Sequence, residues 1–250
     1  MADIPKAQDQ LFDAGSSALD KYARLVVGRS GWLALIRHEL ITLASQAVPG
    51  ALGLVLRKAL YPRLLGACGR NVVFGQNVVL RHPGKIRIGD DVVIDDNCLL
   101  DAKGDRNSGI TISSGVFVGR NTILSCKNGD IAIGDRANIG FNCEIFSASL
   151  VTVGADALLA AYCYVIGGDH DYADASTPVT AQGRRSQGVS VGEGVWMGAG
   201  ATILDGVRIG GHAIIGAGSV VRVDVPEYAV AAGRAARIVG MRGGHQPPAE

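Results

Sequence analysis

Aliphatic residues recur six positions apart over most of this chain, in groups of three. The first group is Ile88, Ile94 and Leu100, and the remaining groups follow it up to residue 221. Their members are, in order, Ile112, Val118, Leu124, Ile133, Ile139, Ile145, Val153, Leu159, Val165, Val191, Met197, Ile203, Ile209, Ile215 and Val221. A repeat with a fixed period predicts an array of equal structural units.

Each six-residue unit predicts one short strand and one corner, and three units close a triangular coil. Such coils stack at the strand spacing of about 4.8 Å, with backbone hydrogen bonds running from coil to coil. The aliphatic residues then fill the interior as ladders. With an earlier coil marked by Phe74, Leu80 and Ile86, the pattern predicts an all-β solenoid of about seven coils over residues 71–226.

Two further positions follow the same period. The residue directly after the aliphatic is often glycine, as at Gly154 and Gly198, and we expect it to supply the unusual φ and ψ of a tight corner. The residue four positions after the aliphatic is usually small and is expected to point inward. Three cysteines at this position are therefore predicted to be buried and inert: Cys98, Cys143 and Cys163.

Two polar segments interrupt the period. Residues 101–109 are expected to form an exposed loop. Residues 167–188 form a longer loop between two regular coils, and a long loop held by a rigid scaffold is a frequent place for functional residues. After the last coil, residues 227–250 are predicted to be a C-terminal extension and tail.

Residues 1–70 follow a different pattern, which predicts helices over residues 7–27 and 32–61, the second broken at Pro49-Gly50. Two interpretations of this helical segment stay open. In one, residues 31–66 contact a membrane surface, with Arg57, Lys58 and Arg63 near anionic headgroups. In the other, the helices cap the open edge of the first coil.

Composition agrees with a narrow aliphatic prism and limits the classes of function. The 250 residues include 35 Gly, and aromatic residues make up only 5%. A net charge of +1 excludes a strongly basic nucleic-acid binder. Five cysteines without a C-x-x-C pair disfavour a disulfide framework and favour a reducing cytoplasm. We expect no signal peptide and no transmembrane span, so the predicted location is cytoplasmic, with peripheral contact at the inner membrane face as an option.

The stretch from residue 188 to residue 240 resembles the hexapeptide-repeat acyltransferases, above all the galactoside, virginiamycin-type and exopolysaccharide O-acetyltransferases. The resemblance lies in V-W-M-G-A-G at residues 195–200, G-A-G-S-V-V at residues 216–221 and the histidine-bearing loop. It implies a left-handed parallel β-helix, a homotrimer and acetyl-CoA as cosubstrate. It also implies acetyl transfer to a sugar hydroxyl of a surface polysaccharide or of its lipid-linked precursor.

The resemblance implies that His170, in the loop sequence Gly-Gly-Asp-His-Asp, is the general base. Histidine suits this role because its pKa lies near neutral pH. Asp171 or Asp169 is expected to orient the ring, and Asp169 is also a candidate for binding the acceptor. One coil earlier, Asn142 is expected to bind the acceptor, and Glu144 to bind it or to assist the base.

The resemblance also implies that acetyl-CoA binds along the later coils. Trp196 matches a tryptophan near the pantetheine arm or an adjacent subunit. The backbone N–H groups of Gly198 and Ala199 are candidate donors to the oxyanion. Small residues match positions where the arm approaches the backbone; these are Gly198, Ala199 and Ala217. Basic residues that are expected to meet the phosphates are Arg222, Arg234 and Arg237.

The chain departs from the family near its end. Val223 stands where the family often has a lysine, and Arg234-Ala235-Ala236 stands in place of Asn-Pro-Ala. No metal site is expected, because the other histidines do not pair at metal-ligand spacing. Two alternatives to a sugar O-acetyltransferase remain: an N-acetyltransferase acting on an amino sugar nucleotide, and a non-catalytic β-helix that serves as a scaffold. The expected partners are a carbohydrate acceptor and further copies of the chain, without nucleic acid.

Overall fold

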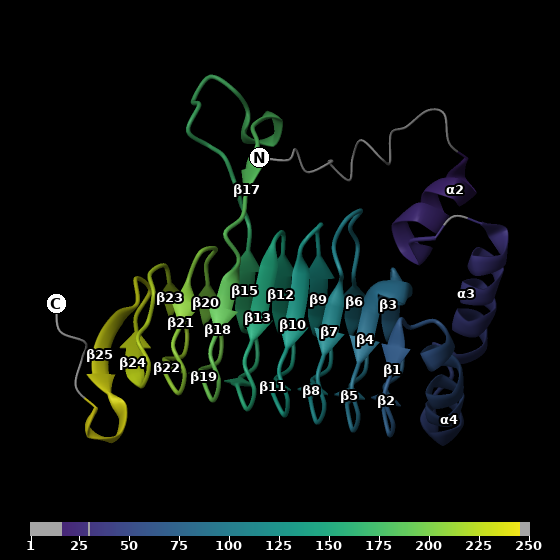
Figure 1. Cartoon of the computed structure of the whole chain (residues 1–250), viewed down its shortest axis with the longest axis horizontal. Coiled ribbons are helices and arrows are strands. Elements are labelled where there is room, and N and C mark those ends of the chain that lie inside the picture. Colours follow the sequence, from purple (N-terminus) through teal and green to yellow (C-terminus); the bar gives the residue numbers. More distant parts are fainter. Residues whose placement is uncertain (1–16, 30, 246–250) are drawn as a thin grey trace.

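The computed structural model describes residues 17–29 and 31–245. A helical segment is followed by a long solenoid of stacked turns (Figure 1). The helical segment comprises α2 (Ala18–Tyr22), the π-helical η1 (Ala23–Val27), α3 (Trp32–Ser45), α4 (Gly50–Leu60) and the 3-10 turn η2 (Tyr61–Arg63). The break predicted at Pro49-Gly50 is confirmed, since Pro49 is the N-cap residue of α4. The part of the first predicted helix that precedes residue 17 lies outside the described residues.

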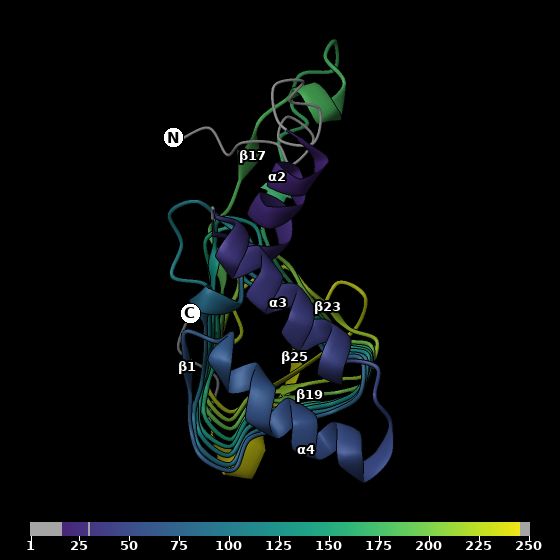
Figure 2. The ribbon, with the colours of Figure 1, turned by 90° about the vertical axis from the view of Figure 1, so that its right-hand side faces the viewer.

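Three parallel sheets, here called A, B and C, form the walls of the solenoid (Figure 2). Sheet A contains β1 (Ala67–Cys68), β4 (Ile86–Ile88), β7 (Ile110–Ile112), β10 (Asp130–Ile133), β13 (Leu150–Val153), β18 (Val189–Val191) and β21 (Arg208–Ile209). Sheet B contains β2 (Val73–Phe74), β5 (Val93–Ile94), β8 (Phe117–Val118), β11 (Asn138–Ile139), β14 (Leu158–Leu159), β19 (Trp196–Met197), β22 (Ile214–Ile215), β24 (Ala229–Ala232) and the antiparallel β25 (Arg237–Met241). Sheet C contains β3 (Val79–Arg81), β6 (Leu99–Asp101), β9 (Ile123–Cys126), β12 (Glu144–Ser147), β15 (Tyr164–Gly167), β20 (Thr202–Ile203) and β23 (Val220–Val221).

The interior is built from the repeated aliphatic residues, as the period predicts. All eighteen are buried, with exposed fractions of at most 3%. Equivalent residues of successive turns lie side by side, so Ile133 pairs with Ile112 of the turn before and Val153 of the turn after. The small residues four positions later, including Cys98, Cys143 and Cys163, are buried too. The predicted left-handed parallel β-helix is therefore confirmed.

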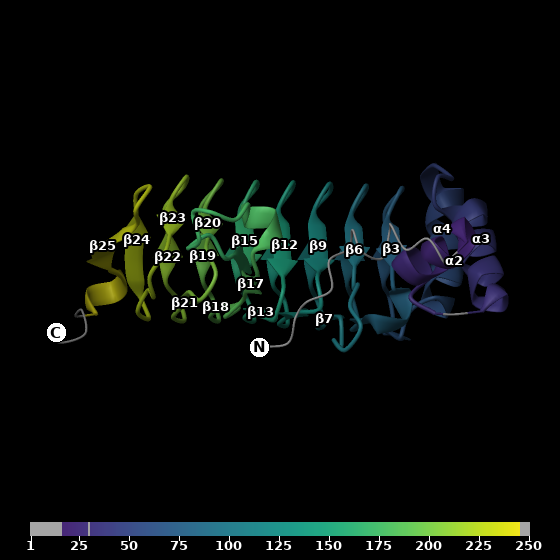
Figure 3. The ribbon, with the colours of Figure 1, turned by 90° about the horizontal axis from the view of Figure 1, so that it is seen from above.

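The solenoid is longer than the seven coils expected, with about eight turns stacked side by side (Figure 3). Parallel pairing begins at Ala67 in β1 and continues to β24, beyond the last aliphatic triple. The sequence period misses both ends, because the terminal turns replace the repeated aliphatics with other residues. The antiparallel β25 then covers the last turn.

The glycines that follow the buried aliphatics have a different purpose from the one expected. Neither Gly154 nor Gly198 has a positive φ, whereas residues two positions further along, such as Asp156 and Gly200, do. A Cβ atom on Gly154 would lie 2.5 Å from the backbone nitrogen of Glu193. Glycine is required there because the backbones of successive turns approach closely, so the explanation by unusual φ and ψ is wrong.

The inner side of the helical segment closes the N-terminal end of the solenoid (Figure 2). Tyr61 is buried, and its hydroxyl donates a hydrogen bond to the Val78 carbonyl at 2.9 Å. Arg57 is 2% exposed, and its Nε donates to the Phe74 carbonyl at 2.9 Å. The expectation that Arg57 lies near lipid headgroups is wrong, because this guanidinium is committed to backbone carbonyls inside the cap.

The outer sides of α3 and α4 are apolar and remain uncovered. Six large side chains are each at least 60% exposed there, and together they define the outer apolar face: Trp32, Leu33, Leu40, Leu43, Leu52 and Val55. Within residues 17–29 and 31–245, no helix combines the length and the apolar character needed to cross a bilayer. The helical segment therefore has an inner face that caps the solenoid and an outer face that no residue of 17–29 or 31–245 covers.

Candidate active site

The long loop at residues 167–188 leaves the solenoid between β15 and β18 and folds back as a hairpin (Figure 1). Its strands β16 (Asp169–His170) and β17 (Arg184–Arg185) pair antiparallel, with His170 opposite Arg184. The turn η4 (Val179–Ala181) lies near the tip. This hairpin gives His170 a defined backbone position, although the sequence predicts only a loop here.

Hydrogen bonds hold both the tip and the base of the hairpin. At the tip, the Asp174 carboxylate accepts hydrogen bonds from the hydroxyls of Ser176 and Thr177, which lower its pKa to about 2. At the base, the Ser186 hydroxyl donates to the Gly167 carbonyl at 2.9 Å. The hairpin is therefore an ordered extension of the solenoid and can position a reacting group.

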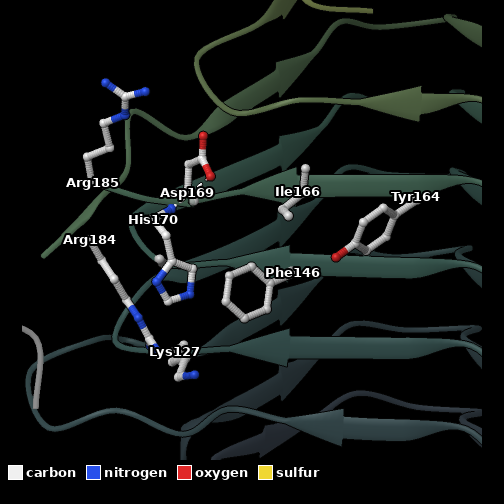
Figure 4. A pocket seen from close by; sticks show the side chains of 10 residues that line it. Lys127, Phe146, Tyr164, Ile166, Asp169, His170, Arg184 and Arg185 are labelled. Atoms are coloured by element: carbon white, nitrogen blue, oxygen red, sulfur yellow. Dashed lines mark hydrogen bonds between the residues drawn. The ribbon is translucent and has the colours of Figure 1, made fainter. Parts of the chain in front are cut away.

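A pocket of about 160 Å³ lies where the hairpin meets the outer face of sheet C (Figure 4). Outward side chains of β12 and β15 form its floor; these are Phe146, Tyr164 and Ile166. The half-exposed His170 lies over this floor, with its ring beside that of Phe146 in Figure 4. Cationic side chains complete the rim; these are Lys127, Arg184 and Arg185.

Neither ring nitrogen of His170 is hydrogen-bonded to another of the described residues, so both are available to a substrate. The carboxylate of Asp169 accepts the backbone N–H of His170 at 2.8 Å and so fixes the backbone rather than the ring. The expected hydrogen bond from the ring to Asp171 is absent from the described structure. Neighbouring residues of an extended strand point to opposite sides, so Asp171 faces away from His170 within this chain.

Glu144 and Asn142 occupy different places relative to the pocket. Glu144 pairs with Tyr164 across β12 and β15, on the same outer face as the pocket floor, but does not line the pocket. Burial, and secondarily the charge of Glu144, raises the pKa of the Tyr164 hydroxyl. Asn142 lies at the corner before β12 with a φ of 55°, and its side-chain oxygen accepts a hydrogen bond from Asn121 at 3.1 Å. The structure thus brings Glu144 near the pocket and gives Asn142 a partner in the preceding turn.

Trp196 lies on a different wall from His170. It occupies the outer face of sheet B, between Leu158 of the turn before and Ile214 of the turn after, and is 48% exposed. The pocket lies on sheet C. A single chain therefore does not bring Trp196 and His170 together.

Small residues follow Trp196 at the corner between sheets B and C. Gly198, Ala199 and Ala217 all lie at this corner, on two successive turns. The N–H of Gly198 donates to the Ile215 carbonyl at 2.7 Å, so it is already used between turns. Among the described residues no such acceptor faces the N–H of Ala199, which leaves it as the available donor of the two.

The three arginines expected to meet phosphates lie at the C-terminal end of the solenoid. Arg222 directly follows β23, Arg234 lies in the turn between β24 and β25, and Arg237 begins β25. All three side chains are exposed. They occupy turns beyond the hairpin, whereas the pocket extends over the turns before it.

Sequence reasoning missed most of the pocket. Lys127, Phe146 and Tyr164 come from three different turns, and no local motif marks them. One signal was present: residues that alternate with buried positions in the strands of sheet C must point outward, onto the face where the loop begins. A second signal was the position of Arg184 and Arg185 in the loop of residues 167–188, where the six-residue period is interrupted.

The described residues contain no group of three or more His, Cys, Asp and Glu side chains arranged to hold a metal ion. The inward cysteines differ in environment, since the hydrogen bond with Cys163 lowers the pKa of the Cys143 thiol, whereas Cys98 is held in its unreactive thiol form. Burial raises the pKa of the Cys98 thiol to about 11, which keeps it protonated at neutral pH. The pocket is thus left with His170 as the lining group suited to proton transfer near neutral pH.

Comparison with known proteins identifies the family. The pattern described as "Bacterial transferase hexapeptide (six repeats)" matches residues 188–222, and "Hexapeptide repeat of succinyl-transferase" matches residues 130–166. WbbJ of Escherichia coli K12, whose name assigns it to lipopolysaccharide biosynthesis as an O-acetyl transferase, is 30% identical over 149 residues. That match covers 57% of this chain and 74% of WbbJ. The chain belongs to the hexapeptide-repeat acyltransferase superfamily.

Two other members illustrate the range of similarity. Rv3034c of Mycobacterium tuberculosis, named as an acetyltransferase, is 29% identical over 133 residues, which are 53% of this chain and 44% of that protein. The solved polysialic acid O-acetyltransferase OatWY is 21% identical with a TM-score of 0.56, covering 73% of this chain and 90% of its own. At this identity the likeness to OatWY concerns the fold alone. The chain spans about half the length of most of the curated relatives it matches.

Proposed function

We propose that this hexapeptide-repeat protein transfers the acetyl group of acetyl-CoA to a hydroxyl of a sugar, in a surface polysaccharide or its lipid-linked precursor. The observation that carries the proposal is His170: a half-buried imidazole, held by a hairpin over a pocket, whose ring nitrogens bond to none of the described residues. The similarity to WbbJ, named as an O-acetyl transferase of lipopolysaccharide biosynthesis, supports the choice of acceptor.

In the proposed reaction the acceptor hydroxyl attacks the carbonyl carbon of the thioester while His170 takes its proton. A C–O bond forms, the C–S bond breaks, and the imidazolium returns the proton to the departing thiolate of CoA. One histidine can serve both steps, because an imidazole accepts and returns a proton near neutral pH. The negative charge that develops on the carbonyl oxygen requires a preorganised donor, and we assign this role to the N–H of Ala199.

The corner between sheets B and C is the proposed path of the pantetheine arm. Residues 198–200 and 216–218 are all Gly or Ala, so the arm can approach the backbone without meeting a long side chain. Trp196 stands at one edge of this path. Arg222, Arg234 and Arg237 lie further along and are the proposed contacts of the phosphates.

We propose that the protein is a homotrimer, because these two sets of residues lie on different walls of one chain. His170 belongs to sheet C and Trp196 to sheet B, so a complete site requires the sheet B wall of one copy to face the sheet C pocket of the next. The exposed Leu158 and Trp196 supply apolar surface for such a contact. Sedimentation equilibrium is expected to give three times the mass of the chain, and a monomer would contradict this arrangement.

The function is tested by incubating the protein with acetyl-CoA that is labelled in its acetyl group. The acceptors are neutral, acidic and amino sugars, both free and as nucleotide conjugates. We expect label in the acceptor that mild alkali removes, because esters hydrolyse under conditions that leave amides intact. Alkali-stable label would support the N-acetyltransferase alternative. Label in no sugar and no release of CoA would support the scaffold alternative.

We further propose that the outer apolar face of α3 and α4 rests on the membrane that carries the lipid-linked acceptor. Exposed basic residues of the same helical segment match anionic headgroups; these are Arg37, Lys58 and Arg63. Deleting the helices is a poor test, because Tyr61 and Arg57 also cap the solenoid. Substitution of Leu40 and Leu43 by Ser changes the outer face alone.

In flotation with phosphatidylglycerol vesicles, we expect the Leu40→Ser, Leu43→Ser protein to bind at least about tenfold more weakly than the wild type. Leu150→Ser is the matched control, since Leu150 is an exposed leucine on the solenoid. Vesicles of phosphatidylcholine should bind less of every variant. Equal flotation of the double variant and the wild type would refute the membrane contact.

A further inference from the structure

We propose that the pocket beside His170 selects an acceptor that carries a negative charge, held by Lys127 and Arg184. This inference rests on the acyl transfer proposed above and adds the chemical class of the acceptor. The charge is the carboxylate of an acidic sugar or the phosphate of a sugar phosphate. Lys127 directly follows β9, and Arg184 belongs to β17 and extends toward it on the side of His170, whereas the neighbouring Arg185 points the other way, with its guanidinium over the Tyr172 ring (Figure 4).

No carboxylate neutralises these cations in the described part of the chain. Neither Lys127 nor Arg184 forms an ion pair there, although exposed pairs such as Arg136 with Asp156 exist elsewhere on the solenoid. Asp169 is the single acidic residue that lines the pocket, and its carboxylate accepts the backbone N–H of His170. The rim is therefore a positively charged surface without a counter-ion among the described residues, and an anionic ligand would supply one.

Bringing these cations together is unfavourable without an anion. The pKa of Lys127 is lowered, first by partial burial and then by the positive charges of Arg184 and Lys103. A bound anion would relieve this repulsion, because it interacts favourably with each cation at once. The guanidinium of Arg184 also offers a planar pair of donors that suits a carboxylate or a phosphate.

The floor of the pocket fits the rest of a sugar. Phe146 and Ile166 are apolar, and Tyr164 adds a ring with a hydroxyl. Binding sites for small molecules commonly combine such a floor with a few polar groups that fix the orientation. A sugar ring lying on Phe146 with its charged group at the rim would present a hydroxyl to His170 (Figure 4).

The position of the cluster separates it from the proposed contacts of CoA. The pocket extends over the turns of β9, β12 and β15, before the hairpin, whereas Arg222, Arg234 and Arg237 lie in turns after it. Each turn adds about 4.8 Å along the axis. The pocket therefore extends from His170 toward the N-terminal turns, whereas the proposed contacts of CoA lie toward the C-terminal turns, which leaves the pocket cluster for the acceptor.

The test compares acceptors that differ in one charge: galactose, galacturonate and galactose 1-phosphate, with glucose, glucuronate and glucose 1-phosphate as a second series. We expect kcat/KM for the charged members to exceed that of the neutral sugar at least tenfold. A higher kcat/KM for galacturonate than for galactose 1-phosphate would identify a carboxylate as the preferred charged group, and the reverse would identify a phosphate. Lys127→Gln and Arg184→Gln should lower kcat/KM for the charged acceptor about ten- to hundredfold, mainly through KM, and leave the neutral sugar within about twofold.

Arg208→Gln is the matched control, because Arg208 is an exposed arginine on sheet A, away from the pocket. Equal use of charged and neutral sugars, or equal losses on both, overturns the inference. A rise in the KM for acetyl-CoA in the Arg184 variant also overturns it, since the cluster would then serve the cosubstrate. Saturation-transfer NMR of the same sugars tests charge-dependent binding without catalysis. The charged sugars should bind the wild type and the His170→Ala protein, and fail to bind the Arg184→Gln protein.

Failure of this inference is distinguishable from failure of the proposed function. Transfer that depends on His170 but ignores acceptor charge would refute only the charge selection. Binding of charged sugars without acetylation of any acceptor would refute only the proposed function.

Discussion

Replacement of His170 by alanine lowers kcat for acetyl transfer by about 10²- to 10⁴-fold, the range that a general base contributes. The KM for acetyl-CoA should change little, because its proposed contacts are Trp196, the small corner residues and the C-terminal arginines. The fold should be unaffected, since the His170 side chain is half-exposed and makes no hydrogen bond to the described residues. Release of CoA thiol, followed with a colorimetric thiol reagent in the presence of acceptor, measures the effect.

His245→Ala is the control for this experiment, because His245 is an exposed histidine far along the chain. Its activity should match that of the wild type. A His170→Ala protein within about tenfold of the wild type would remove His170 as the base. Glu144, which begins β12 two residues before Phe146 of the pocket floor, would then be the next candidate for the base.

Replacement of Ile139 by aspartate should unfold the solenoid. Ile139 is fully buried in β11, between Val118 of the turn before and Leu159 of the turn after. The change removes about 1.5–3 kcal/mol of apolar burial and leaves an unpaired carboxylate in the core. A loss beyond about 4 kcal/mol is expected, which is comparable with the whole stability of many domains. Urea unfolding followed by circular dichroism measures the loss.

The neighbouring residue supplies a matched control. Asn138 precedes Ile139 in the same strand and is exposed, so Asn138→Asp introduces the same charge on the outer face. It should change the free energy of unfolding by no more than about 0.5 kcal/mol. A soluble Ile139→Asp protein with the cooperative transition of the wild type would contradict the inward register of this strand.

The period of six was sufficient to predict the core because the fold repeats. Each turn contacts only the turn before and the turn after, so a residue such as Ile133 needs the same character as Ile112 and Val153. The position of a residue in the six-residue repeat therefore also fixes whether its side chain lies in the core. The corner glycines show the limit of this reasoning, since the requirement at Gly154 comes from the backbone of the next turn rather than from its own φ.

The candidate site could be predicted only in part. His170 stood out because its loop breaks the period and resembles that of the family. Lys127 and Phe146 gave no local signal, because they belong to regular turns that lie far from the loop in sequence. The expected contact between Asp171 and the ring is absent among the described residues for a geometric reason, since adjacent residues of the hairpin strand face opposite sides.

The sequence by itself thus determined the solenoid, its inward ladders and the loop that carries His170, because each depends on a repeat or on a departure from one. Only the tertiary structure decided what surrounds His170. Stacking turns brings residues separated by about a turn of chain to within the strand spacing of about 4.8 Å, so outward side chains of three turns meet beneath the hairpin. Their character is not constrained by the period, because outward positions need not match from turn to turn, and the positively charged pocket appears only when the turns are stacked.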